Sequence, residues 1–140
     1  MKTTMLILVA MLFVPQAANA ASWGAISIDN DGLTNTAWNY PTKQEAIDIV
    51  SNRCTQSSAL PDTCYYVAVP DNYWAFALHC KTEGLRKGYV EWGNSAKQAI
   101  VNVYKEAVGP DTAYAKHECK IQGFTTGNGS HRKYKQEKEE

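Results

Sequence analysis

The sequence has no excess of charge of either sign. Its 140 residues include 14 Lys and Arg against 14 Asp and Glu, so the formal net charge is zero at pH 7. Proteins that bind nucleic acids use an excess of basic side chains to displace counterions from phosphates. The balance therefore argues against that class of protein, and we expect no nucleic acid among the partners.

The signatures of common catalytic sites are also lacking. The sequence contains no G-x-S-x-G elbow, no H-E-x-x-H pair and no phosphate-binding glycine loop. It has only three histidines, whereas an enzyme needs a base close to an acid or a nucleophile. We therefore expect a protein that is not an enzyme and that uses no cofactor.

Long hydrophobic runs are absent as well. The apolar run over residues 5–14 follows Lys2 and precedes "ANA", which ends at Ala20. It is too short for a membrane-spanning helix, which needs about 20 apolar residues, and it predicts a secretory signal peptide over residues 1–20. We expect an exported protein, periplasmic or secreted, with no membrane span and one domain over residues 21–125.

Four cysteines follow the predicted signal peptide: Cys54, Cys64, Cys80 and Cys119. In an oxidising compartment an even number of cysteines indicates disulfides first. Cys54 and Cys64 enclose only nine residues, "TQSSALPDT", so we predict that they form one bond. Elimination then pairs Cys80 with Cys119.

A second interpretation of the cysteines stays open. His79 precedes Cys80, and His117 lies two residues before Cys119. Two His and two Cys can bind a tetrahedral zinc ion, although these spacings are not those of the common zinc modules. We expect disulfides and no metal, but free thiols would allow a zinc-dependent or thiol-dependent enzyme.

One stretch of the sequence occurs twice in similar form. "TKQEAIDIVSNRC" begins at Thr42 and "SAKQAIVNVYKEA" begins at Ser95. Each opens with an S/T-x-x-E/Q capping box, whose side chains satisfy N–H groups at a helix start, and each continues with apolar residues on one helical stripe. We predict helices over Lys43–Arg53 and Ala96–Val108.

The similarity extends to the sequence around both helices. Two predicted strands separated by a polar turn precede each helix, and a strand that opens with a cysteine follows it. The six predicted strands are Trp23–Ile28, Leu33–Tyr40, Cys64–Val69, Trp74–His79, Lys87–Trp92 and Cys119–Phe124. One unit cannot cover its own sheet, so two units should pack together. The predicted fold class is α+β, with duplicated strand–strand–helix–strand units, antiparallel strands packed by two helices, and disulfides.

The order of these features resembles a known family. "WGAI" after the signal peptide, a capping box after an aromatic residue, an "EA" helix, a cysteine at the helix end and another opening the next strand are similar to the exported bacterial family catalogued as domain of unknown function 4189. The resemblance covers Trp23–Phe124 and implies a pattern that recurs in a second half. Members usually have further cysteines where this chain has Tyr73–Trp74 and Ala107.

Tyrosine and tryptophan are abundant, with 8 Tyr and 4 Trp against 3 Phe. Tyr65 and Tyr66 are neighbours on a predicted strand, so they point to opposite faces and one should face solvent. The turn "PDN" places Tyr73 near a loop tip, whereas Trp74 starts a strand and is expected to be structural. Tyr and Trp carry binding energy at protein interfaces. Tyr66 and Tyr73 are therefore our candidate partner-binding residues.

Residues 126–140 contain mainly polar and charged side chains of both signs. Such a segment buries too little apolar surface to offset its ordering entropy, so we expect a polar disordered tail. The whole pattern predicts a small exported module that binds another protein in the bacterial periplasm or envelope, as an immunity protein or an inhibitor does. The partner would be a protein such as an envelope-targeting toxin or a hydrolase. A structural or adhesin-like role in the envelope stays open as an alternative.

Overall fold

The computed structural model describes residues 21–109 and 114–133, so the predicted signal peptide lies outside the described residues. Two units of strand, strand, helix and strand follow each other along the chain, as predicted. The first consists of β1 (Trp23–Ile28), β2 (Thr34–Tyr40), α1 (Lys43–Ser57), the short 3₁₀ helix η1 (Pro61–Thr63) and β3 (Tyr65–Pro70). The second consists of β4 (Trp74–Thr82), β5 (Leu85–Gly93), α2 (Ala96–Ala107), η2 (Lys116–Glu118) and β6 (Cys119–Thr126).

Both helices start at the predicted caps. The hydroxyl of Thr42 accepts a hydrogen bond of 3.2 Å from the Glu45 N–H. The hydroxyl of Ser95 accepts one of 3.1 Å from the Gln98 N–H. Because each cap satisfies a backbone donor that the helix itself cannot, the start of each helix is encoded locally.

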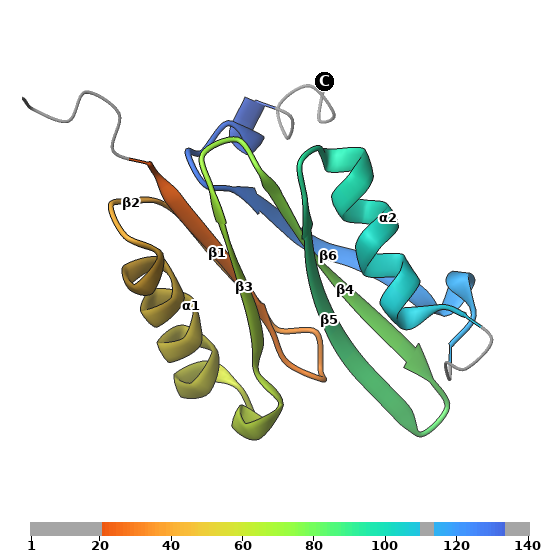
Figure 1. Ribbon diagram of the computed structural model, residues 1–140. Coiled ribbons are helices and arrows are strands. Elements are labelled where there is room, and N and C mark those ends of the chain that lie inside the picture. The colour runs from red at the N-terminus through yellow and green to blue at the C-terminus, as the bar shows by residue number, and fades with distance from the viewer. Residues whose placement is uncertain (1–20, 110–113, 134–140) are drawn as a thin grey trace, which may run out of the picture.

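The strands form two antiparallel sheets of three strands each, in the orders β2-β1-β3 and β5-β4-β6. The first strand of each unit is therefore central in its own sheet. Figure 1 shows the two sheets packed together, with α1 on the outer side of the first and α2 on the outer side of the second. The predicted α+β class is confirmed, and the structure adds that the strands divide into two sheets within four layers.

Apolar side chains fill all three spaces between these layers. In β1, Ala25 faces α1 while Ile26 faces the second sheet, because neighbouring strand residues point to opposite faces. Both β1 and β4 are therefore covered on both faces. The space between the sheets contains Ile26, Ile28, Val69, Ala75 and Ala77.

Both predicted disulfides are present, but they lie in different places in the two units. Cys54, near the end of α1, is bonded to Cys64, which precedes β3, with 6.1 Å between the Cα atoms. Cys80 of β4 is bonded to Cys119, its direct partner on β6, with 4.0 Å between the Cα atoms. The second unit cannot repeat the first arrangement because Ala107 ends its helix.

Part of the segment that we expected to be a tail belongs to the fold. Thr126 and His131 are buried, and the Thr126 N–H donates to Nδ1 of His131 at 3.1 Å. The ring of His131 meets Trp38 edge-on, with 5.0 Å between the ring centroids. The domain therefore continues to residue 133, whereas residues 134–140 lie outside the described part of the chain.

Candidate functional site

Exposed apolar side chains gather around two strands. Five of the eight large apolar side chains that are exposed in the described part of the chain lie on β3, on β5 or directly before β4. These five are Tyr65, Tyr66, Tyr73, Leu85 and Trp92, and the other three are Leu33, Leu60 and Val101. We refer to Tyr65, Tyr66, Tyr73 and Trp92 as the aromatic edge.

Four of these five side chains lie on two strands that are next to each other, β3 and β5. Among the described strands, β3 pairs with β1 alone and β5 pairs with β4 alone, so each is an edge strand of its sheet. The sheets stack so that β3 and β5 contact each other (Figure 1). Aromatic side chains that would be buried on central strands remain exposed on these edges.

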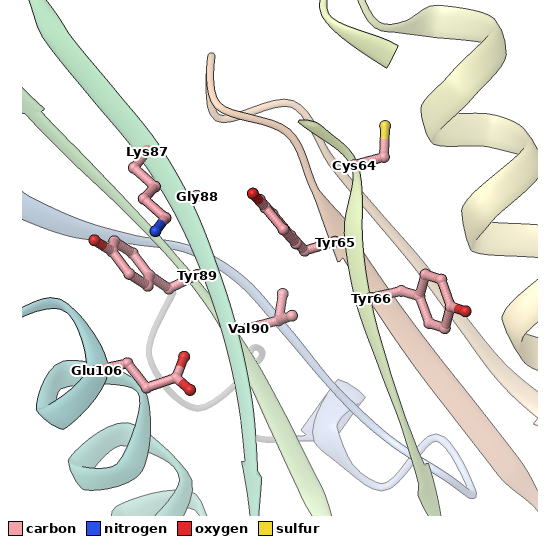
Figure 2. A pocket seen from close by; sticks show the side chains of 8 residues that line it. All are labelled: Cys64, Tyr65, Tyr66, Lys87, Gly88, Tyr89, Val90 and Glu106. Carbon is pink, nitrogen blue, oxygen red and sulfur yellow. The ribbon is translucent and has the colours of Figure 1, made fainter. Parts of the chain in front are cut away.

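Tyr65 and Tyr66 point to opposite sides of β3, as the sequence predicts for neighbouring strand residues. Figure 2 shows Tyr65 turned toward β5 and Tyr66 turned away from it. Only one of them was expected to face solvent, but their exposed fractions are 44% and 50%. Both are exposed because the start of an edge strand has a neighbouring strand on one side only.

Tyr73 stacks on Trp92, with 5.9 Å between the ring centroids and 11° between the ring planes. Both rings stay partly in solvent, with exposed fractions of 39% for Tyr73 and 47% for Trp92. Trp92 is not among the binding residues predicted from the sequence. A usable signal was present, because the equivalent residue of the first repeat is Asn39, a polar residue that is also exposed.

The two tyrosines that we selected from the sequence lie apart. Tyr66 is near the start of β3, where it pairs with Ser27, whereas Tyr73 follows the far end of that strand. Tyr66 and Tyr73 line two separate grooves. The structure therefore places both candidates on the surface but not in one small patch.

The larger groove has a volume of about 600 Å³ and lies between β3, β5 and α2. Figure 2 shows β5 running between α2 on one side and β3 on the other. The residues that line this groove are Cys64, Tyr65, Tyr66, Lys87, Gly88, Tyr89, Val90 and Glu106. Aromatic rings and groups of both charges therefore meet at the free edge of β5.

A pair of carboxyl groups joins β5 to α2 at this groove. Partial burial, then a hydrogen bond with Glu91 and the charge of Glu91, raise the pKa of Glu106 to about 7, against the opposing effect of Lys87. Near neutral pH Glu106 therefore still holds its proton in part. The ammonium of Lys87 lies over the ring of Tyr89, 5.1 Å from its centroid.

Glu91 also lines the second groove, whose volume is about 520 Å³. That groove contains the stacked rings of Tyr73 and Trp92, together with the polar side chains of Asn94, Gln98 and Asn102. The contact between Glu91 and Glu106 thus lies where the two grooves approach each other, between β5 and α2. The candidate site consists of these two grooves and the aromatic side chains that line them.

The alternative site built on His79, Cys80, His117 and Cys119 has no thiols. Both cysteines are in the disulfide that joins β4 to β6, and no cysteine of the described chain is free. The Nε2 atom of His79 lies 2.9 Å from the Asn30 carbonyl oxygen. In the described ranges no group of three or more His, Cys, Asp or Glu side chains is arranged to hold a metal ion. In this disulfide neither Cys80 nor Cys119 offers a free thiol to a metal ion or a substrate.

The fold and the site together define a duplicated, disulfide-bonded α+β domain with an exposed aromatic edge. The chain belongs to the family described as Domain of unknown function (DUF4189), whose model matches residues 23–125. The family expected from the sequence is thus confirmed. No curated protein and no solved structure is similar enough to this chain to match it. None of the described helices has the length and the apolar character needed to cross a membrane.

Proposed function

We propose that this protein is a non-enzymatic binding module that occludes a protein partner, in the manner of an inhibitor or an immunity protein. The observation that carries the proposal is the aromatic edge, in which Tyr65, Tyr66 and Trp92 lie on two neighbouring edge strands and Tyr73, directly before β4, stacks on Trp92. Tyr and Trp are enriched among the residues that dominate the binding energy of protein interfaces. The surface of a soluble domain seldom exposes such side chains together without a binding role.

The stacked pair of Tyr73 and Trp92 supports the same proposal. Each ring restricts the movement of the other, so little conformational entropy is left to lose when a partner covers them. Amide side chains of α2 and of the residues before it surround the pair. An apolar centre with a polar rim is the usual composition of a protein interface.

We place this activity outside the cytoplasm, in the periplasm or the envelope. Two disulfides support an oxidising compartment, since cytosolic thiols are kept reduced. The predicted signal peptide over residues 1–20 agrees with that location. An envelope-targeting toxin or a hydrolase is the kind of partner that an exported occluding protein would meet.

Affinity capture from a cell-envelope extract tests the proposal. The baits are the wild-type protein, an edge variant with Tyr73→Ala and Trp92→Ala, and a control variant with Leu60→Ala and Val101→Ala. The control residues have similar exposure, 40% and 39%, but lie away from the edge. We expect a protein that the wild type and the control retain and that the edge variant loses.

Calorimetry with that purified protein then measures the effect directly. Loss of a hot-spot aromatic costs about 2 kcal/mol or more, so the edge variant should bind at least about 30-fold more weakly. The proposal is wrong if every captured protein binds the three baits equally well. It is also wrong if the captured protein is a substrate that the bait converts.

A further inference from the structure

We propose that the groove beside β5 receives an extended segment of the partner protein, and that a basic side chain of this segment binds between Glu91 and Glu106. The inference rests on the proposed function, because it names the chemistry by which a protein partner would be recognised. It follows from three features of this region: a free strand edge, a stretch of that edge to which no described side chain bonds, and two carboxyl groups near a single ammonium.

The free strand edge belongs to β5, which has β4 as its only neighbour among the described strands. Alternate backbone N–H and C=O groups of an edge strand point away from the sheet, where an added strand can pair with them. In Figure 2 the strand runs between Glu106 of α2 and Tyr65 of β3. A segment that pairs with β5 would therefore be flanked by both side chains.

In the described part of the chain, two side chains form hydrogen bonds with this edge, at separate points. The Gly88 N–H donates to Oδ1 of Asn30 at 3.2 Å, and Nδ2 of Asn102 donates to the Trp92 carbonyl at 2.8 Å. Outward-pointing groups recur at every second residue, so the backbone groups of Val90 point outward as well. Val90 lies between these two points and lines the groove. The stretch from Gly88 to Trp92 is about 13 Å long, at about 3.3 Å per residue, and a short extended segment of similar length could pair with it.

Two carboxyl groups and one ammonium lie at this groove and the adjoining one, since Glu106 and Lys87 line the first and Glu91 lines the second. A hydrogen bond with Glu91 and the charge of Glu91 help raise the pKa of Glu106 to about 7, so Glu106 keeps its proton in part near neutral pH. Lys87 is the one basic residue that lines the groove, and its ammonium lies over the ring of Tyr89. An arginine or lysine from the partner would take the place of the proton on Glu106, and Tyr65 offers that cation an aromatic ring.

This exchange makes binding sensitive to pH. Two residues of β5 affect the pKa of Glu106: Glu91 raises it and Lys87 lowers it. Glu106 in turn raises the pKa of the Tyr89 hydroxyl. Tyr65 and Tyr114 also raise the pKa of Tyr89, after burial, so that phenol stays neutral near pH 7. The proton and the cation of the partner compete for the same carboxyl groups. Affinity should therefore increase as the pH rises through about 7.

A phage-displayed library of linear heptapeptides, selected on the purified protein at pH 8, supplies the probe. The enriched peptides are synthesised and titrated by calorimetry into the wild type, into a Glu91→Gln, Glu106→Gln variant, and into Glu83→Gln as a control at an exposed position on the β4–β5 turn. We expect the enriched sequences to share an Arg or Lys. Replacing that residue by Gln, or both glutamates by Gln, should weaken binding at least about tenfold, while the control binds as the wild type does.

The remaining outcomes separate this inference from the proposed function. Wild-type binding should be tighter at pH 8 than at pH 6, and the double glutamine variant should lose that difference. Peptides that need Tyr73 and Trp92 but neither glutamate would overturn the inference and leave the proposed function standing. A selection that enriches no glutamate-dependent peptide would also overturn it. So would a dimer in sedimentation that Tyr65→Ala dissociates, because the edge would then serve a second copy of this chain.

Discussion

The carboxylate of Asp29, directly after β1, accepts a hydrogen bond of 2.5 Å from the hydroxyl of Ser58, which follows α1. The same carboxylate also accepts the N–H groups of Asp31 and Leu33, each at 2.9 Å. Asp29 is almost completely buried. It occupies the position that Cys80 occupies in the second unit, six residues after the tryptophan that opens each repeat. The first unit thus uses a buried carboxylate where the second uses a disulfide.

Replacing Asp29 by alanine should lower the free energy of unfolding by about 3 kcal/mol. The change leaves two backbone N–H groups and one hydroxyl without their acceptor, and unpaired buried donors are costly. Urea unfolding followed by tryptophan fluorescence measures the loss. Asp31→Ala is the matched control, because its exposed ion pair with Arg86, at 3.2 Å, should contribute less than about 1 kcal/mol. Equal losses in the two variants would contradict this role for Asp29.

The two disulfides should differ in their contribution to stability. Removing Cys54–Cys64 with two serines should cost roughly 2–4 kcal/mol. Removing Cys80–Cys119 should cost about 1 kcal/mol more, because it closes a separation of 39 residues rather than 10, and a longer loop gains more from closure. Chemical unfolding of the two double-serine variants under identical conditions measures both values. If removing Cys54–Cys64 lowered the free energy of unfolding more than removing Cys80–Cys119, local packing and not loop closure would decide which bond contributes more.

Glu106 should make the protein less stable as the pH rises from about 4.5 to about 7. Its pKa is raised to about 7 by partial burial and by Glu91, so over that range the folded state holds a proton that the unfolded chain has released. Below about 4.5 the carboxyl is protonated in both states and the penalty disappears. The difference in free energy of unfolding between Glu106→Gln and the wild type should therefore grow with pH and level off above about 7. If the free energies of unfolding of the variant and the wild type differed by the same amount at pH 4 and pH 8, this role of Glu106 would be disproved.

His131 should make the protein more stable, not less, as the pH rises. Burial, and then the charge of Arg132, lower the pKa of this histidine, so the unfolded chain takes up a proton more readily than the folded protein. Its contribution to stability is present above the ordinary histidine pKa of about 6.5 and is lost as the pH falls below it. Unfolding of His131→Gln between pH 5 and pH 8 should show a weaker fall on the acidic side than the wild type. His117→Gln, at an exposed position, should keep the wild-type profile.

Tyr66→Ala combined with Tyr73→Ala should weaken partner binding and leave the fold nearly unchanged. Both side chains are at least 39% exposed, so the main loss is the stack of Tyr73 on Trp92, about 1 kcal/mol. Trp74→Ala is the contrasting variant, because Trp74 packs on Phe76 and the α2 side of its sheet. It should cost about 3 kcal/mol. Thermal unfolding that ranks the double tyrosine variant below Trp74→Ala would show that the tyrosines belong to the core.

Signals between neighbours in the sequence predicted most of the secondary structure. The capping boxes at Thr42 and Ser95 predicted both helix starts correctly. Each capping hydroxyl accepts a hydrogen bond from the N–H only three residues further on, so the signal is local. The end of α1 was placed too early, at Arg53. The helix runs to Ser57, since the Ser58 N–H still reaches the Cys54 carbonyl at 2.8 Å. The last residue of a helix depends on single hydrogen bonds of this kind, and the sequence gives only a weak indication of where the last one forms.

The candidate site was only partly predictable for a different reason. Composition and alternation indicated exposed tyrosines, and Tyr66 and Tyr73 are indeed on the surface. The stack on Trp92 joins residues 19 positions apart, and the carboxyl pair joins a strand to the helix after it. Neither pairing leaves a periodic pattern in the sequence, because both depend on how α2 and the loop before β4 lie against β5.

By itself, the sequence determined the order of the elements, the duplication, the helix caps and the Cys54–Cys64 bond. Each of these follows from periodicity or from short spacings, which local backbone geometry turns directly into structure. Only the tertiary structure decided that the strands form two sheets, that β3 and β5 are their neighbouring free edges, and that His131 returns to pack on Trp38. Those outcomes depend on which apolar faces cover each other, and that is settled by the packing of whole elements rather than by any one segment.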